Sequence, residues 1–124
     1  MTISYFGDLG KTKRFLMQNF DRFAQGLLSR YGRRGVRALQ AATPTRTGKT
    51  ASSWSYEIIK ADNKYELTFN NANVNRGENI AILIQYGHGT ATGGYVPPTD
   101  YINPALSDIF KSLGEEIVRS LNNG

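Results

Sequence analysis

The chain of 124 residues contains no cysteine, a single histidine (His88) and a single tryptophan (Trp54). Without cysteine, neither a disulfide nor a thiolate metal site can form, so the fold does not depend on an oxidising compartment. Transition-metal sites usually draw on several His, Cys or carboxylate ligands, and this chain offers one imidazole. We therefore expect a protein that holds no metal and no other cofactor.

Long apolar runs are also absent. The longest covers residues 80–84, whereas a membrane-spanning helix needs about 20 apolar residues. The N-terminus has no basic segment followed by an apolar one, so no secretion signal is predicted. We expect a soluble, unexported protein with no membrane contact. Its length suits one domain over residues 1–124.

Acidic residues are scarce in the first part of the chain. Residues 1–50 hold ten Lys or Arg and two Asp, whereas residues 51–124 hold five Lys or Arg and eight acids. The net charge of +5 is therefore concentrated at the front. Such a chain suits nucleic acid, an acidic protein or the acidic end of a second copy, and charge alone does not choose among them.

Hydrophobic spacing predicts an α+β fold that begins with helical structure. Residues 2–9 alternate weakly, as an edge strand or an arm would. From Thr12 to Ala42, apolar residues recur every three or four positions, which predicts a helix. Three glycines inside it each cost about 1 kcal/mol relative to alanine, and we expect a break or kink near Gly26. Pro44 ends the helix, so residues 43–49 are predicted to form a loop.

From residue 53 the apolar period changes to two, which predicts a β-hairpin. Its strands cover residues 53–61 and 64–71, joined by a two-residue turn. This turn places Ala61 opposite Lys64, and the pairing then follows along the strands. In that register Ile58 lies opposite Leu67, Tyr56 lies opposite Phe69, and the two apolar faces coincide.

The following segments are less regular. Residues 70–79 are polar and rich in asparagine, which predicts a surface loop. Residues 80–86 are apolar, but the segment is too short for periodicity to distinguish a helix from a strand. Residues 87–98 contain four glycines and then two prolines, and are predicted to form a long exposed loop.

A C-terminal helix is predicted over residues 104–121. Asn103 is typical of an N-cap and Pro104 of a first helical residue. The apolar stripe of this helix comprises Leu106, Phe110, Leu113, Ile117 and Leu121. We expect the stripe to pack on the aromatic face of the hairpin.

Two short motifs resemble catalytic or nucleotide-binding sites, but neither has the residues that such a site needs. Thr47-Gly48-Lys49-Thr50 resembles the end of a phosphate-binding loop, but that loop needs a glycine five residues before Gly48, and the chain has Thr43 there. His88 lies between two glycines, and no nucleophile in a diagnostic setting accompanies it. We expect a histidine with a structural or contact role and no enzymatic activity.

Arginines on the predicted first helix form a basic face, with further cations just beyond it. Such a face binds phosphates, contacts carboxylates of a protein, or is simply solvated. Tyr95 and Tyr101 flank the two prolines, where aromatic residues either anchor an interface or fold back over the core. The candidate interface residues are Arg30, Arg33, Arg34, Arg37, Arg46, His88, Tyr95 and Tyr101.

Several short motifs follow one another in a recognisable order. Pro44-Thr45-Arg46-Thr47-Gly48 precedes Ser52 and Ser53; Ile80-Ala81 leads to Tyr86-Gly87; Tyr101-Ile102-Asn103-Pro104-Ala105-Leu106 opens the last helix. Taken together they resemble the tail-completion proteins of long-tailed bacteriophages, also called neck, head-tail joining or putative tail-component proteins. Related head-closure and virion-morphogenesis branches share the pattern. The chain departs from the family at Gln85, where glutamate is common, and at Thr50, where leucine is common.

The resemblance implies a structural, non-enzymatic minor tail protein of the virion, assembled in the bacterial cytoplasm. Such a protein completes the head-proximal end of the tail and enables head-tail joining. It would act as a ring, often of six copies, and be monomeric in isolation. Its partners would be the tail tube protein, head connector or stopper proteins and, in the channel, DNA. The resemblance also favours a helix over residues 80–86. A nucleic-acid-binding module that uses Arg30, Arg33, Arg34 and Arg37 is the alternative.

Overall fold

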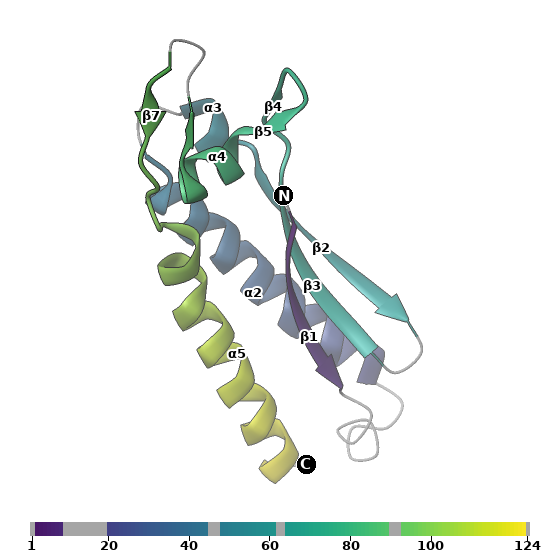
Figure 1. Cartoon of the computed structure of the whole chain (residues 1–124). Helices are drawn as coiled ribbons and strands as arrows, with labels where there is room; N and C mark the ends of the chain where they lie inside the picture. The colour runs from purple at the N-terminus through teal and green to yellow at the C-terminus, as the bar shows by residue number, and fades with distance from the viewer. Residues whose placement is uncertain (1, 9–19, 45–47, 62–63, 90–92, 124) are drawn as a thin grey trace.

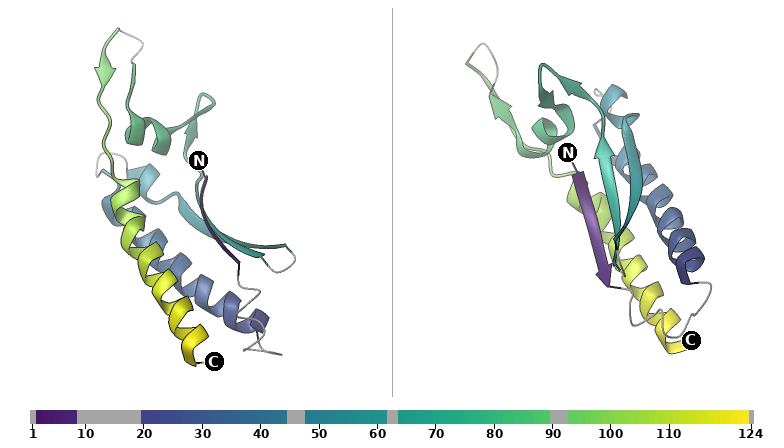
Figure 2. Two further views of the ribbon diagram at one scale, coloured as in Figure 1. Left: turned by 60° about the horizontal axis from the view of Figure 1, so that its bottom comes forward. Right: turned by 90° about the vertical axis from the view of Figure 1, so that its right-hand side faces the viewer.

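The computed structural model describes residues 2–8, 20–44, 48–61, 64–89 and 93–123, and it has the expected α+β architecture. An antiparallel sheet with strand order β1-β3-β2 carries the two long helices, α2 and α5, on one face (Figures 1 and 2). These elements are β1 (Thr2–Asp8), α2 (Phe20–Ala42), β2 (Trp54–Ala61), β3 (Lys64–Asn71) and α5 (Ile102–Asn123).

The hairpin of β2 and β3 has the predicted register. Ala61 pairs with Lys64, and Tyr56 pairs with Phe69. Residues 2–8 form an edge strand, β1, which pairs antiparallel with β3 along its whole length. Strand β3 is therefore central, and its apolar side chains Tyr65, Leu67 and Phe69 are all buried in the core.

Helix α2 lies directly on the hairpin because two of its glycines allow a close approach. A Cβ added at Gly32 would overlap the Tyr56 ring, and one added at Gly35 would overlap the Phe69 ring. Gly26 has nothing within 4 Å of such a Cβ. The helix runs without interruption through all three glycines, so the predicted break near Gly26 is wrong.

Helix α5 packs beside α2, and the two helices share the core. The Tyr31 hydroxyl donates to the Ser112 carbonyl oxygen (3.3 Å), and Leu113 is fully buried between the layers. The expected contact with the hairpin occurs where the Phe110 ring lies 6.2 Å from the Phe69 ring. The helix starts at Ile102, two residues earlier than expected, so Asn103 lies inside its first turn and is not the N-cap.

Short elements gather at one end of the molecule, which we call the small end (Figure 1). The segment over residues 80–86 is a helix, which decides the alternative left open by its length. The predicted loop 43–49 gives way at its end to a helical turn. The elements are α3 (Gly48–Ala51), β4 (Val74–Asn75), β5 (Glu78–Asn79), α4 (Ile80–Tyr86), β6 (His88–Gly89) and β7 (Tyr95–Val96).

Residues 70–79, predicted to be a surface loop, are more ordered than expected. Asn71 continues β3 and is buried, and Asn73 is also buried. The segment then forms the β4–β5 hairpin, whose turn residues Arg76 and Gly77 both have positive φ (53° and 78°). Two consecutive turn residues with positive φ match the right-handed twist of the flanking strands, so a two-residue turn is enough to connect β4 and β5.

Candidate functional site

A group of buried polar side chains connects the elements of the small end. Thr50 is completely buried; its carbonyl oxygen accepts from Asn71 Nδ2 (2.8 Å) and its hydroxyl oxygen accepts from Asn73 Nδ2 (2.7 Å). Asn79 donates through Nδ2 to the Asn71 carbonyl (3.0 Å) and accepts from the Ala81 amide (3.1 Å), which caps α4. The group thus fixes α3 and α4 to the end of β3.

Gln85 joins α4 to the start of α5. Its Oε1 accepts from the backbone amides of Tyr101 (3.1 Å) and Ile102 (3.0 Å), and its Nε2 donates to Asp100 Oδ1 (2.7 Å). The first amides of a helix have no partner within the helix, so this side chain supplies a cap from a distant part of the sequence. Gln85 is buried, which makes the contact part of the core of the small end.

Tyr101 is part of the same joint. Its hydroxyl donates to the Ala81 carbonyl oxygen (3.0 Å), and burial raises the pKa of the phenol to about 12. Of the two alternatives for this residue, folding back over the core holds, because only 5% of it is exposed. Tyr101 is therefore not an exposed anchor in this chain.

The remaining candidates on the glycine-rich segment are placed by their backbone. His88 pairs with Val96 and Tyr95 pairs with Gly89 in the short β6–β7 ladder, within the predicted loop. Arg46 lies outside the described residues. The β6–β7 ladder, and with it His88 and Tyr95, belongs to the small end (Figure 1).

The arginines of α2 are all exposed, but they have different neighbours. Arg30 forms an ion pair with Glu116 of α5. The guanidinium of Arg34 lies 4.8 Å from the centre of the Tyr31 ring, a cation–π contact. Arg33 and Arg37 lie toward β2, where they line a groove. The basic face thus has one side bound to α5 and one side open.

The groove between α2 and β2 has a volume of about 440 Å³. Within the described chain, neither of its arginines forms an ion pair, whereas Lys60 further along β2 is bonded to Asp21 (2.8 Å). This bond raises the pKa of Lys60. The lining residues are Arg33, Val36, Arg37, Gln40, Ser55 and Tyr56.

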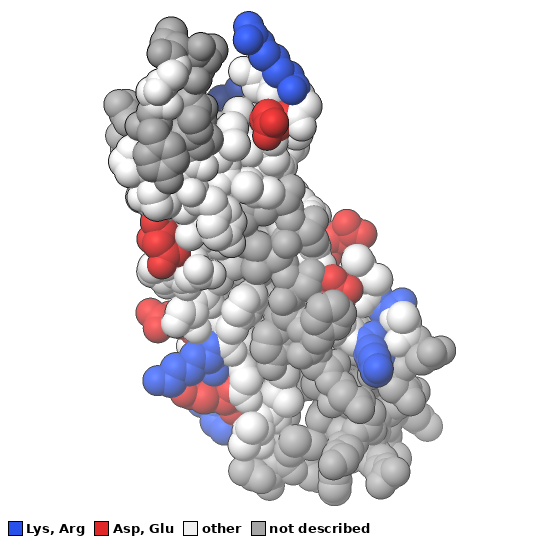
Figure 3. All heavy atoms as spheres, viewed as in Figure 1, with Lys and Arg blue, Asp and Glu red and all other residues white. Residues whose placement is uncertain are grey.

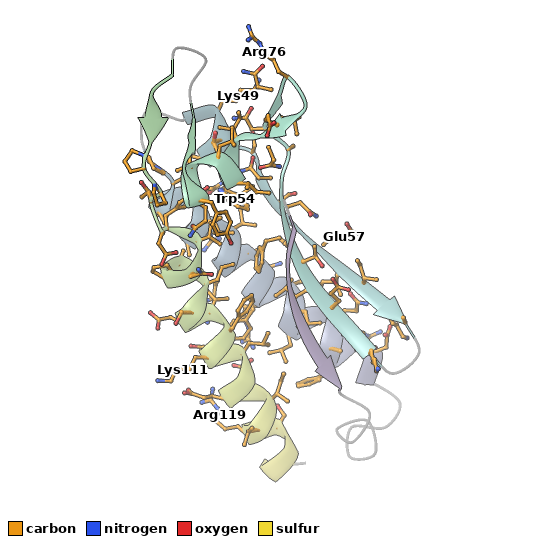
Figure 4. All side chains as sticks on the ribbon, in the orientation of Figure 1. Lys49, Trp54, Glu57, Arg76, Lys111 and Arg119 are labelled. Atoms are coloured by element: carbon orange, nitrogen blue, oxygen red, sulfur yellow. The ribbon has the colours of Figure 1, made fainter. Side chains whose placement is uncertain are left out.

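Exposed residues of α5 alternate in charge along the helix. Asp108, Lys111, Glu115 and Arg119 follow one another, and Figure 3 shows acidic and basic atoms side by side over this part of the surface. Lys111 and Arg119 point outward from α5 in Figure 4. The excess of acids in the second part of the chain therefore does not form a uniform acidic face on this helix.

The described part of the chain contains no cluster of three or more His, Cys, Asp or Glu side chains that could hold a metal ion. Within the same residues, none of the helices combines the length and apolar character that crossing a bilayer requires. Known family models, curated proteins and solved structures gave no match to this chain.

Sequence reasoning missed the residues that organise the small end. The surface loop predicted over residues 70–79 rests on the frequency of asparagine in turns, and it gives no sign that Asn71, at the end of the predicted strand, and Asn73 are buried. Gln85 carried a usable signal, since it is a polar residue within the apolar segment IAILIQY. A buried polar side chain needs a hydrogen-bonding partner, and that requirement could have directed attention to the nearby helix start.

Proposed function

We propose that this protein is a structural component of a bacteriophage neck, which completes the head-proximal end of the tail and enables head-tail joining. The support is the ordered set of motifs that resembles tail-completion proteins, together with what these motifs do in the fold. Residues from separate motifs meet in one joint at the small end. This convergence is the observation on which the proposal depends.

The joint brings together motif residues that are far apart in the sequence. Ala81 accepts a hydrogen bond from Tyr101, and Gly87 ends α4 with a positive φ of 78°. Ile102 and Leu106, from the last motif, are buried at the start of α5. The last two motifs therefore belong to one architectural unit, as expected for a family defined by a shared fold.

The proposed mode of action is assembly without catalysis. Copies would form a ring, of six in the form that the resemblance suggests, and would remain monomeric until tail tube and connector proteins are present. The small end carries the exposed side chains of Val74, Ile82 and Tyr86, with Ile82 and Tyr86 one helical turn apart on α4. Exposed apolar residues of this kind are suited to contacts with neighbouring subunits.

Deleting the gene from a phage that carries it tests the proposal. We expect filled heads and complete but unattached tails in electron micrographs of the lysate. Supplying the intact gene in trans should restore joined particles, which excludes an effect on neighbouring genes. Normal virions from the deletion strain would refute the proposal.

The alternative of a nucleic-acid-binding module is favoured by Arg33 and Arg37, which are exposed and form no ion pair with other described residues. It predicts DNA binding that weakens steeply with salt, because counterions are released from the phosphates. Arg33→Glu should reduce this binding far more than Arg119→Glu on α5. Fluorescence anisotropy with duplex DNA at low salt would exclude the alternative if no binding is seen.

A further inference from the structure

We propose that the groove between α2 and β2 binds an extended, acidic segment of a partner protein, which adds to the sheet as a strand along β2. The inference goes beyond the neck role and does not depend on ring formation. The inference rests on three features, which are the outer edge of β2, the apolar floor of the groove and the two arginines beside that floor.

The outer edge of β2 has no partner strand in the part of the chain that the structure describes. In the order β1-β3-β2, this strand has a described neighbour on one side. It is eight residues long and contains no proline. In an antiparallel pair, every second residue directs its amide and carbonyl away from the partner strand, so β2 offers a row of such groups at its outer edge. A row of this kind is a template for another strand.

The groove lies at this edge. Ser55 and Tyr56 are consecutive and therefore point to opposite faces of the sheet, yet both line the groove. A groove at the rim of β2 can contact both residues, and α2 runs alongside this strand (Figure 2). An added strand would thus have β2 on one side and α2 above it.

The floor of the groove is apolar and firmly held. Tyr56 rests against the backbone of α2 at Gly32, where no side chain intervenes. Val36 contributes a second apolar surface from the helix. Alternate side chains of an added strand point to the same face, so apolar residues of the incoming segment could rest on this floor.

Charge determines the composition of the segment. Arg33 and Arg37 are one helical turn apart and both line the groove. Arg30, on the same helix, already has Glu116 as its partner, and Lys60 on β2 has Asp21. The two groove arginines form no ion pair within the described chain and are therefore free to bind carboxylates of another molecule. A guanidinium group binds a carboxylate through two parallel hydrogen bonds.

A peptide suits this groove better than a nucleic acid does. The row of backbone groups on β2 pairs with a peptide backbone, for which a phosphate backbone has no counterpart. The apolar floor between the arginines matches aliphatic side chains.

The test uses the full chain and a fluorescein-labelled peptide of roughly the length of β2. Every second residue of the peptide is alternately valine and glutamate, and the residues between them are serine, so that the apolar and acidic side chains share one face. Fluorescence anisotropy at low salt should show saturable binding. Arg33→Glu combined with Arg37→Glu should weaken it at least about tenfold. The matched control, Lys111→Glu with Arg119→Glu, makes the same change in net charge on α5 and should leave the affinity nearly unchanged.

Three further arms locate the binding mode. A peptide with N-methylated alternate amides cannot pair with a strand edge and should not bind, and a peptide with lysine in place of glutamate should not bind either. Since the chain has no cysteine, a peptide with a terminal cysteine can be cross-linked to Ser55→Cys. The Ser107→Cys variant on α5 should give no cross-link.

Several results would overturn the proposal. These are no binding of the acidic peptide, equal binding of the N-methylated peptide, or equal loss of binding in the α5 control. A short oligothymidylate that binds more tightly than the peptide, and depends on Arg33 and Arg37, would assign the groove to nucleic acid. If circular dichroism shows that the doubly reversed variant is unfolded, Arg33→Gln with Arg37→Gln replaces it, with the same expectation.

Discussion

At Gly32 and Gly35 the backbone of α2 rests on the rings of Tyr56 and Phe69. We predict that Gly32→Ala and Gly35→Ala each lower the free energy of unfolding by about 1–3 kcal/mol, because the added methyl group forces the helix away from the sheet. Gly26→Ala is the matched control and should raise it by up to about 1 kcal/mol, since alanine favours the helix and this site is open. Urea denaturation of the three variants gives the comparison.

The predicted changes in the free energy of unfolding have opposite signs at the packed and open glycines, so the series tests the close approach directly. All three substitutions gain the same helix propensity, so any difference among them reports the space around the glycine. Equal stabilisation by all three alanines would contradict the close approach of α2 to the hairpin.

Tyr101 links stability to alkaline pH. Its pKa of about 12 in the folded chain lies above the ordinary tyrosine value of 10.0. The unfolded chain therefore loses this proton first, and the stability associated with the neutral phenol is lost as pH rises from about 10 toward 12. We predict that Tyr101→Phe lowers the free energy of unfolding by about 1 kcal/mol at neutral pH, because the hydrogen bond to the Ala81 carbonyl is lost. Between about pH 10 and 12, the free energy of unfolding of the Tyr101→Phe variant should fall less steeply than that of the parent chain.

The pH series is measured by urea denaturation at fixed ionic strength. Tyr86→Phe is the control for removal of a tyrosine hydroxyl, because 65% of Tyr86 is exposed. Identical slopes for the parent chain and Tyr101→Phe would show that the phenol titrates as freely as it does in the unfolded state.

At the scale of single residues, the sequence predicts properties that depend on local chemistry but not those that depend on a neighbour far along the chain. The free-energy cost of a glycine in a helix is local, and it can be predicted from the sequence. The need for glycine at positions 32 and 35 comes from Tyr56 and Phe69, more than 20 residues away in the sequence. No periodicity within α2 reports that neighbour.

Among the elements, the joint between α4 and α5 is the clearest case of one side chain connecting two helices. We predict that Gln85→Ala lowers the free energy of unfolding by about 1–3 kcal/mol, because the amides of Tyr101 and Ile102 lose their acceptor in a buried site. Thermal denaturation followed by circular dichroism measures the change.

Gln85→Glu separates the two roles of the side chain. A glutamate keeps the acceptor and adds negative charge at a helix N-terminus, which is favourable. It also loses the donor to Asp100 and places a second carboxylate beside it. We expect a loss of stability that is recovered when Asp100→Asn is added. Failure of this second substitution to restore stability would show that Gln85 does not act through Asp100.

The elements were predictable to different degrees. The hairpin register followed from two alternating apolar runs and a two-residue turn, all of which are local. The start of α5 could not be predicted from local signals. Asn103 and Pro104 are typical of a helix start, but the side chain that caps the helix is Gln85 on α4. The order at residues 70–79 was missed for a similar reason, since the partners of Asn71 and Asn73 lie on α3.

On the scale of the whole molecule, the two ends are stabilised in different ways. The body between the sheet and the helices is held by buried apolar residues such as Leu39 and Leu67. The small end relies on hydrogen bonds through single polar side chains. The elongated arrangement in Figure 2 separates these regions along the length of the helices.

We predict that this difference appears in native-state hydrogen exchange. Amides of Leu39 and Leu67 should exchange only by global unfolding, whereas those of the β4–β5 hairpin should exchange by local opening. Thr50→Val removes the acceptor for Asn73 and should accelerate exchange over residues 70–86 more than at Leu39. Mass spectrometry at a series of denaturant concentrations distinguishes the two behaviours. A uniform response over the chain would mean that both ends open together.

The tight turn at Arg76 and Gly77 has a practical use. Both residues are exposed, nothing lies within 4 Å of a Cβ placed at Gly77, and Arg76 marks the far tip of the small end in Figure 4. An epitope of a few residues inserted between them would lie outside the packed body. Antibody labelling of intact phage particles would then test the proposed position in the neck, and the orientation of the chain there, without altering a buried contact.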